Sequence, residues 1–348
     1  MAANRKHGAT LPPPGTVLAD RYQLLHPIGE GGMSTVYLAE HIAIGRKLAI
    51  KILVPEYRNN REVLDRFLQE ARAVSLIRHE HIVDITDIGR TGQGLAFLAM
   101  EYLEGEDLST TLLRETRLPW IRLRRMILQI CRALHAAHRM GVVHRDIKPE
   151  NCFRIKRGGN HDFIKILDFG IAKFIADDGK SRVQRPRIQS GDNVMLGTPE
   201  YMAPELARGE TPTGSADVYA LGSLMYHALV GRPPFVGESA AEVLSMQLRD
   251  EPVPPRQVAP DAEIPASIER IVLRAMAKDP AERFASVREL TEAIIHADAR
   301  LSRVTRTQLP AIPDEIPPTM HARAGARRAS GTAGRGETDA DVEEVLDP

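Results

Sequence analysis

The sequence contains very little cysteine, and this scarcity excludes two classes of protein. Cys131 and Cys152 are too few for a disulfide framework, and no Cys-x-x-Cys pair or Cys/His cluster suggests structural zinc. A reducing compartment is therefore the default. Cys152 directly follows Asn151, which leaves a reactive thiol as an alternative. We favour a reduced, mostly buried side chain, because free cysteine is usually buried.

Long hydrophobic runs are also missing. The most apolar helix-like stretch, Tyr219 to Val230, is short and is interrupted by Ser223 and His227. Nothing approaches the roughly 18 apolar residues that a membrane span needs. The first ten residues carry charge with no apolar segment after it, so we expect no signal peptide. These absences predict a soluble, cytoplasmic protein.

The chain has no excess of either charge. Lys plus Arg number 46 and Asp plus Glu number 46, so the balance gives no reason to expect a nucleic acid or an anionic membrane as partner. With 348 residues, of which 43% are hydrophobic, the chain is long and apolar enough for one large or two modest domains with a real core.

The apolar pattern predicts strands first and helices later. From Arg21, short alternating runs separated by Gly-containing turns predict antiparallel strands, in Y-Q-L-L-H-P-I-G, V-Y-L-A-E and K-L-A-I-K-I-L. Apolar residues at three- and four-residue spacing then predict an amphipathic helix over 60–74, with Glu70 at the edge of its apolar stripe. Two further strands are expected near 81–88 and 95–102.

After Gly105 the pattern becomes mostly helical. A long helix is expected to end before Gly141, a typical C-terminal stop, and further helical patterns occupy 217–230, 240–248, 266–277 and 286–297. His135 and His138 could be read as a metal pair. They lie three apart without an acidic third ligand, so we interpret them as ordinary helix residues. The long polar segment 171–197 predicts a functional or mobile loop.

The chemistry concentrates in the stretch His144 to Asn151, which reads H-R-D-I-K-P-E-N. It places a guanidinium, a carboxylate, an ammonium and an amide within eight residues. Asp168 follows Asn151 by seventeen residues, inside F-I-K-I-L-D-F-G. Such a set suits a magnesium-bound phosphate, because one carboxylate can handle a hydroxyl while an Asn/Asp pair holds a hard cation through oxygen.

A glycine-rich stretch at 29–36 reads G-E-G-G-M-S-T-V. Its glycines allow a tight turn and a close approach of backbone N–H groups to phosphates. A dinucleotide-binding fold would need a strand, loop and helix here, but V-Y-L-A-E continues as a strand and predicts a hairpin lid instead. Lys51, at a strand end, would normally be a solvated charge; Glu70 offers it a partner.

In this order and at this spacing, the motifs resemble the eukaryotic-type (Hanks-type) protein kinase family over roughly residues 21–297. The motifs are G-E-G-G-M-S-T-V, A-I-K, Glu70, H-R-D-I-K-P-E-N, D-F-G, G-T-P-E-Y-M-A-P-E, D-V-Y-A-L-G and Arg283. The resemblance implies an α+β, two-lobed kinase fold, with a small antiparallel β lobe carrying one helix and a larger, mainly helical lobe. We divide the chain into a flexible lead (1–20), a small lobe (21–104), a large lobe (105–297) and a disordered tail (298–348), whose composition cannot offset its ordering entropy.

The resemblance also implies roles for individual residues. Asp146 accepts or orients the substrate hydroxyl, and Lys148 neutralises charge on the transferring phosphoryl group. Lys51 contacts the α- and β-phosphates of ATP while paired to Glu70. Asn151 and Asp168 ligate Mg²⁺, with Mn²⁺ as an alternative. The implied nucleotide site consists of Ile28, Gly29, Glu30, Gly31, Gly32, Met33, Ser34, Val36, Ala49, Lys51 and, after Met100, the backbone of Glu101 and Leu103.

The wording of the motifs indicates a subclass and one departure. Lys148 in D-I-K-P-E-N, together with G-T-P-E-Y-M-A-P-E, is similar to the serine/threonine kinases. The glycine loop and D-F-G-I-A-K look most like the bacterial branch. Ser34 stands where the family pattern has its third glycine, which makes the tip less permissive but leaves the backbone cradle plausible.

Arg145, before Asp146, implies regulation through a phosphate on the 171–197 loop, because Arg–phosphate pairing can order a loop. We favour Ser190 over Ser181 and Thr198. Incubation with MgATP is expected to place a phosphate on Ser190, measured by mass spectrometry. Full activity without any loop phosphate would contradict this.

Other motif residues are expected to be structural. Asp217 should accept hydrogen bonds from the backbone of the His144–Arg145 turn, and Glu205 should pair with Arg283 away from the chemistry. His144 is expected to be a packing residue rather than a general base. In the tail, R-R-A-S around Ser330 could be a phosphorylation site, but we favour an inert segment because short motifs recur by chance.

Two rival functions remain. A pseudokinase scaffold predicts the loss of Lys51, Asp146, Asn151 or Asp168, and all four are present. A small-molecule phosphotransferase of related fold would not need the peptide-docking motif. We therefore expect ATP and Ser/Thr-containing proteins as partners, no nucleic acid, and dimerisation for autophosphorylation in trans as an option.

Overall fold

The computed structural model describes residues 11–31, 33–58, 60–92, 94–169 and 199–308. The side chains of residues 62, 66, 70 and 300–308 are not part of this description. Residues 1–303 form one compact unit, and residues 304–348 form a second. Everything below concerns the first unit, apart from the last residues of its final helix.

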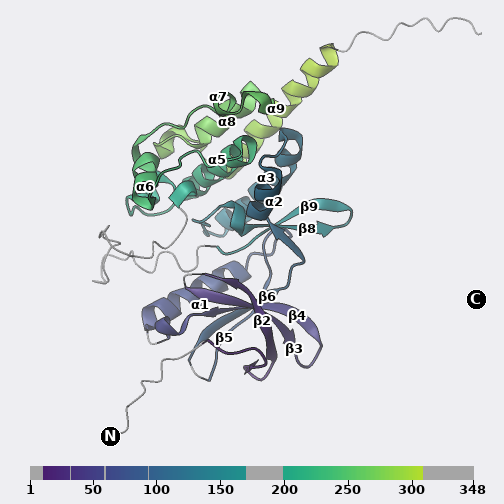
Figure 1. Ribbon diagram of the computed structural model, residues 1–348, viewed down its shortest axis with the longest axis vertical. Helices are drawn as coiled ribbons and strands as arrows, with labels where there is room; N and C mark the ends of the chain where they lie inside the picture. The colour runs from purple at the N-terminus through teal and green to yellow at the C-terminus, as the bar shows by residue number, and fades with distance from the viewer. Residues whose placement is uncertain (1–10, 32, 59, 93, 170–198, 309–348) are drawn as a thin grey trace, which may run out of the picture. The chain divides into compact units, whose positions relative to one another are not determined.

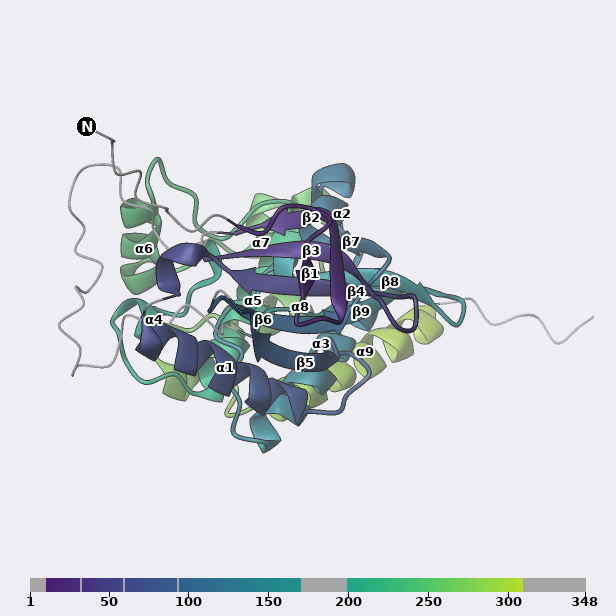
Figure 2. The same ribbon diagram turned by 90° about the horizontal axis from the view of Figure 1, so that it is seen from below.

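The small lobe is built on an antiparallel sheet in the order β1-β2-β3-β4-β6-β5, seen from below in Figure 2. Its strands are β1 (Val17–Leu18), β2 (Tyr22–Glu30), β3 (Ser34–His41), β4 (Arg46–Leu53), β5 (Ile85–Arg90) and β6 (Ala96–Glu101). The strands predicted from Arg21 onward are present, whereas β1 pairs with β2 inside the stretch 1–20 that we expected to be a flexible lead. Neighbours in sequence pair as hairpins, except that β4 pairs with β6 rather than β5.

The two faces of this sheet are buried differently. Along β4, Leu48, Ile50 and Ile52 point to a local core on one face of the sheet. The alternate residues Ala49 and Leu53 join the main core on the other face. Successive side chains of a strand point to opposite faces, so Lys51, between Ala49 and Leu53, is directed toward the main-core side. The strand pattern thereby fixes the direction of a lysine that the sequence alone leaves as a surface charge.

Helix α1 (Arg61–Ser75) covers the main-core face and packs against β5 and β6 (Figure 1). The side chain of Asn60 accepts a hydrogen bond from the backbone N–H of Val63, at 3.2 Å, which caps the first turn. The predicted stripe is buried: Leu64, Phe67, Leu68, Ala71 and Val74 are each at most 9% exposed. The helix predicted over 60–74 is therefore confirmed within one residue at each end.

The large lobe is mainly helical, with a small sheet in the order β7-β8-β9. Its helices and strands are β7 (Gly105–Asp107), α2 (Leu108–Glu115), α3 (Trp120–Arg139), β8 (Cys152–Arg157), β9 (Asn160–Ile166), α4 (Pro204–Ala207), α5 (Gly214–Val230), α6 (Ala240–Arg249), α7 (Pro255–Val258), α8 (Ala266–Ala275) and α9 (Val287–Gln308). Single 3₁₀ turns occupy η1 (Pro55–Tyr57), η2 (Pro149–Asn151), η4 (Pro199–Tyr201), η5 (Pro260–Ala262) and η6 (Pro280–Glu282).

Helix α5 is the centre of this lobe and packs between α3 and α8 (Figure 1). It is apolar around nearly its whole circumference, as expected of a helix surrounded by protein. Thr213 caps its start, and it ends at Gly231, whose φ of +92° suits glycine because a Cβ is disfavoured there. Helix α3 likewise stops just before Gly141, with φ of +73°, as predicted.

Helix α9 runs to Gln308 and passes residue 297, where we ended the large lobe. The first residues of the expected tail are therefore helical. Asp298 is tied to α3 by an ion pair with Arg124, a contact that the local sequence pattern does not reveal. Residues 309–348 lie outside the described residues. In the described part of the chain, no helix combines the length and apolarity needed to cross a membrane.

Candidate active site

The stretch His144 to Asn151 forms the connection between α3 and β8. One buried carboxylate accepts hydrogen bonds from its backbone. Asp217, in the first turn of α5, is completely buried. Its Oδ2 accepts from the backbone N–H of His144 at 2.9 Å, and its Oδ1 accepts from that of Arg145 at 2.8 Å. The predicted role of Asp217 is confirmed. Arg145 has a φ of +68°, a backbone conformation that persists in non-glycine residues only when the surroundings enforce it.

His138 makes a third contact with this carboxylate, since its Nε2 lies 2.7 Å from Asp217 Oδ2. Our interpretation of His138 as an ordinary helix residue missed this contact. The signal that could have revealed it is a polar residue on the apolar face of α3, six residues before His144. Among the described residues, no group of three His, Cys, Asp or Glu side chains is arranged to hold a metal ion.

His144 is a packing residue, as predicted. It is fully buried, its ring lies 4.5 Å from that of Phe169, and its Nε2 lies 2.9 Å from the carbonyl oxygen of Leu167. The backbone N–H of Asp146 donates to Nδ1 at 3.2 Å, so Nε2 must carry the proton that is donated to Leu167. Burial lowers the pKa of His144, which keeps this ring neutral. A neutral imidazole whose two nitrogens are both already hydrogen-bonded is poorly placed to act as a general base.

Asp146, Lys148 and Asn151 converge above this support. The Asn151 amide donates to Asp146 twice, to its carbonyl oxygen at 2.7 Å and to its carboxylate Oδ2 at 3.0 Å. Lys148 Nζ lies 3.8 Å from the same Oδ2. Because the Asn151 Nδ2 is committed to Asp146, its Oδ1 is the atom left for a cation. The site therefore presents one carboxylate, one ammonium and one amide oxygen side by side.

Asp168 and Lys51 join the two lobes at this point. Lys51 Nζ donates to Asp168 Oδ1 at 2.5 Å, and β4 places Lys51 directly opposite Val36 of β3. Burial opposes ionisation of Asp168, but the nearby positive charges, Lys51 first and then Lys148, together lower the pKa of the carboxyl. Asp168 has a φ of +46°, a second strained position at the site. Glu70 lies in α1, but its side chain is outside the described residues, so the Lys51–Glu70 pair stays a prediction.

The glycine-rich stretch is the β2–β3 hairpin, as predicted. Glu30 pairs with Thr35 and Gly29 with Val36, and the Gly31 N–H donates to the Ser34 carbonyl at 2.9 Å. Gly32 lies outside the described residues. Ile28 is 45% exposed, whereas Met33 is 7% exposed and joins the main core. Any contact of Met33 with a nucleotide would therefore come from its backbone, not its side chain.

The segment after β6 carries the other predicted nucleotide contacts. Glu101 is the last residue of β6. Ala49 of β4 lies opposite Met100 of β6, and Leu103 packs against the main core. The Glu101 carboxylate accepts from Lys165 Nζ at 2.6 Å, and Lys165 is 7% exposed. Sequence analysis missed Lys165, a lysine inside the apolar strand F-I-K-I. The Lys165–Glu101 contact links the end of β6 to β9, and Lys165 lies two residues before Leu167 and three before Asp168.

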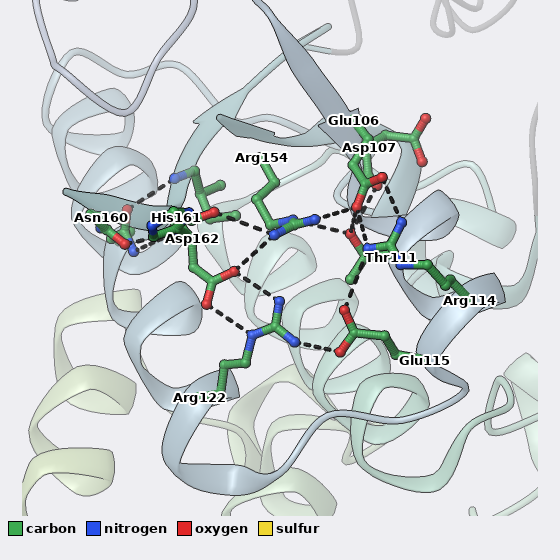
Figure 3. A network of polar contacts seen from close by, with 12 residues as sticks. Glu106, Asp107, Thr111, Arg114, Glu115, Arg122, Arg154, Asn160, His161 and Asp162 are labelled. Carbon is green, nitrogen blue, oxygen red and sulfur yellow. Dashed lines mark hydrogen bonds and ion pairs between the residues drawn. The ribbon is translucent and has the colours of Figure 1, made fainter. Parts of the chain in front are cut away.

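A network of ion pairs fixes the small sheet around the site (Figure 3). Arg154 of β8 contacts Glu106 of β7 and Asp162 of β9. Arg122 of α3 donates twice to Asp162, at 2.8 and 2.9 Å, and Arg114 donates twice to Glu106. Hydrogen bonds from Arg122 lower the pKa of Asp162, and those from Arg114 lower that of Glu106. The strands that flank Asn151 and precede Asp168 are thus cross-linked by paired charges.

The G-T-P-E-Y-M-A-P-E motif is described from Pro199 onward. Ser181, Ser190 and Thr198 lie outside the described residues. Glu205 and Arg283 form the predicted pair: two parallel hydrogen bonds of 2.7 and 2.8 Å join side chains that are 4% and 2% exposed. Cys152 is buried and burial raises its pKa, so the interpretation as a reduced, packed side chain is confirmed over a reactive thiol.

The residues present fit a divalent cation and a polyphosphate. Asn151 and Asp168 offer uncharged and charged oxygen atoms, the ligands that Mg²⁺ takes. Lys51 and Lys148 offer ammonium groups for phosphate oxygens. The donor set does not distinguish Mg²⁺ from Mn²⁺, because both prefer oxygen.

Comparison with known proteins gives consistent results. The family model for the protein kinase domain matches residues 22–296. The chain is 43% identical over 285 residues to the serine/threonine-protein kinase Pkn1 of Myxococcus xanthus, covering 82% of this chain and 39% of Pkn1. It is 35% identical over 299 residues to the serine/threonine-protein kinase PknB of Mycolicibacterium smegmatis, covering 85% and 45% of the two chains. The chain thus spans less than half the length of these relatives.

The fold is similar to that of the PknI kinase domain of Mycobacterium tuberculosis, with a TM-score of 0.64 and 28% identity. The alignment covers 82% of this chain and all of the PknI domain. The similarity therefore includes both the sheet lobe and the helical lobe described above.

Proposed function

This chain belongs to the protein kinase family, and on that premise we propose that it transfers the γ-phosphate of MgATP to serine and threonine hydroxyls of proteins. The observation that carries the proposal is the contact chain Lys51–Asp168 and Asn151–Asp146–Lys148, assembled from both lobes. Phosphoryl transfer demands little covalent work from the protein, so positioning and electrostatic stabilisation dominate.

Each residue of the contact chain has a proposed task. Asp146, oriented by Asn151, accepts a hydrogen bond from the substrate hydroxyl and takes its proton as transfer proceeds. Lys148, beside that carboxylate, balances charge on the moving phosphoryl group. Lys51 holds the α- and β-phosphates, with Glu70 as its second partner. The β2–β3 hairpin covers the nucleotide through its backbone N–H groups, and the backbone of Glu101 and Leu103 meets the adenine edge.

We assign the metal to Asn151 and Asp168. When bound there, Mg²⁺ would supply positive charge to offset the negative charge that develops on the phosphate. Lys51 holds Asp168 in its ionised form, ready to bind a cation. Mn²⁺ remains an alternative metal for the same oxygen atoms.

The experiment uses labelled ATP, Mg²⁺ and myelin basic protein as a generic acceptor, followed by phosphoamino-acid analysis. Label is expected on phosphoserine and phosphothreonine. Asp168→Asn is expected to lower the rate at least about tenfold, because a bound cation supplies several kcal/mol of charge stabilisation. The matched control is Asp84→Asn, an exposed carboxylate in the small lobe, which should leave the rate unchanged.

Two outcomes would contradict the proposal. Binding of ATP without label on any protein, the chain itself included, favours a pseudokinase scaffold. Label on a small molecule but not on protein favours a small-molecule phosphotransferase. The regulatory phosphate on Ser190, dimerisation for autophosphorylation in trans, and a cytoplasmic location are further parts of this proposal.

A further inference from the structure

Helix α6 carries a buried amide that the proposed mechanism does not use. Within this helix, all of which the structure describes, the buried side chains are Val243 and Gln247, four residues apart on one face. Val243 is apolar, as a buried position would predict, but Gln247 is 0% exposed. A buried amide is costly unless its donors and acceptor all have partners.

Gln247 satisfies both ends of its amide. Nε2 donates to the carbonyl oxygens of Glu200 at 2.7 Å and of Pro199 at 3.1 Å, which uses its two hydrogens. Oε1 accepts from the hydroxyl of Tyr219 in α5. The two carbonyls belong to η4, the first described turn after residue 198. The Gln247 side chain therefore forms hydrogen bonds to two consecutive carbonyl groups of this turn.

The orientation of the amide is set by a lysine. Lys278 Nζ donates to the Tyr219 hydroxyl oxygen at 3.2 Å and to the backbone carbonyl oxygen of Gln247 at 3.0 Å. Because the Tyr219 oxygen receives this hydrogen bond, its own proton is directed to Gln247 Oε1, and Nε2 must face η4. Burial lowers the pKa of Lys278 to about 8, so it remains mostly charged at neutral pH.

The same turn has a second polar anchor. The Tyr201 hydroxyl is hydrogen-bonded to Nδ1 of His227, 2.6 Å away, and burial lowers the pKa of that histidine to about 4, which keeps its ring neutral. Helix α5 connects this turn to the catalytic loop, because Tyr219, which donates to Gln247, lies two residues after Asp217, which holds the His144–Arg145 turn. The backbone that Gln247 holds and the loop that carries Asp146 are therefore both fixed to the first two turns of α5.

We infer that Gln247 is a positioning residue for the protein substrate, because its amide ties the Pro199–Tyr201 backbone to α5, the helix that also holds the loop of Asp146. The inference rests on the proposed function and names which step the residue serves. Gln247 touches neither Lys51 nor Asp168, so its loss should weaken engagement of the protein substrate while leaving ATP binding intact.

The test is Gln247→Met, which keeps the length of the side chain but removes its donors. The KM for myelin basic protein is expected to rise roughly tenfold or more, since a buried carbonyl loses its hydrogen bond. The KM for ATP should change less than twofold. Tyr219→Phe, which frees the amide to turn, should give a smaller change in the same direction.

Val243→Ala is the matched control, because it removes buried packing from the same face of α6 and leaves the hydrogen bonds of Gln247 to η4 in place. This control should lower the Tm, and the ratio of the KM for myelin basic protein to the KM for ATP should stay the same as in the parent. The inference is overturned if Gln247→Met only reproduces this pattern, or if its KM for the acceptor stays within twofold of the parent.

A readout that needs no catalysis separates the inference from the proposed function. Hydrogen–deuterium exchange of the Met202 amide, which donates to Pro199 at 3.1 Å, should accelerate in Gln247→Met but not in Val243→Ala. Unchanged exchange overturns the inference even if the parent protein is active. If the parent transfers no phosphate to any protein, the proposed function fails and the KM inference falls with it, whatever the exchange shows.

Discussion

Replacing Asp146 with Asn is expected to lower the rate of phosphate transfer to myelin basic protein at least about a hundredfold, the usual contribution of a positioned general base. Asn has nearly the same shape and can still accept from the Asn151 amide, which reaches the Asp146 carboxylate at 3.0 Å. What it loses is the negative charge that orients the hydroxyl and takes its proton. The measurement is the initial rate at saturating MgATP, together with the Kd for MgATP.

The Kd should stay within about threefold of the parent, since Asp146 contacts Lys148 and Asn151 rather than Lys51. The Asp84→Asn variant serves again as the control for an Asp-to-Asn change at an exposed position. Transfer at the parental rate by Asp146→Asn would remove the assigned role of Asp146. A lost rate accompanied by lost MgATP binding would instead point to collapse of the site.

Breaking the Glu205–Arg283 pair is expected to cost the fold about 3–5 kcal/mol in free energy of unfolding, the usual cost of leaving one buried charge without its partner. Glu205→Gln leaves the guanidinium of Arg283 facing a neutral amide. Arg283→Met is expected to be at least as costly. It also removes donors to the carbonyls of Ala277, Lys278 and Ser215, at 2.7, 3.1 and 3.0 Å.

Urea unfolding followed by circular dichroism measures both variants. The matched control is Glu292→Gln, which breaks the exposed pair of Arg288 and Glu292 on α9, 3.0 Å apart and four residues apart in sequence. That pair is expected to contribute no more than about 0.5 kcal/mol. Equal losses in free energy of unfolding for Glu205→Gln and Glu292→Gln would show that the buried pair stabilises the lobe no more than an exposed pair does.

Periodic patterns predicted most of the fold. The stripe Leu64, Phe67, Leu68 and Ala71 specified α1, and Gly141 marked the end of α3, because local spacing and turn chemistry decide both. Residues with family-like spacing also placed Asp217 and the Glu205–Arg283 pair correctly. The two helix features lie within one short window of sequence, whereas the contacts of Asp217 and of Glu205 span 73 and 78 positions and were predicted only because the motifs resemble a known family.

The rest depends on contacts between distant segments. Lys165 meets Glu101 across 64 positions, Arg154 meets Glu106 across 48, and Gln247 meets Glu200 across 47. Each of the residues Lys165, Arg154 and Gln247 looks like a surface residue in its own segment. Only the packed structure shows that it is enclosed and paired. The continuation of α9 beyond residue 297 was missed for the same reason, because the ion pair of Asp298 is with Arg124 in α3.

The hydrogen bonds from the His144–Arg145 turn to Asp217 have a consequence for how readily that turn can open. Because the two gripped amides are tied to α5, the most enclosed helix of its lobe, they can open only when that helix itself opens. The left-handed Arg145 backbone is therefore as durable as the lobe. The Lys51–Asp168 hydrogen bond joins residues of the two lobes instead, so it can break without opening that helix.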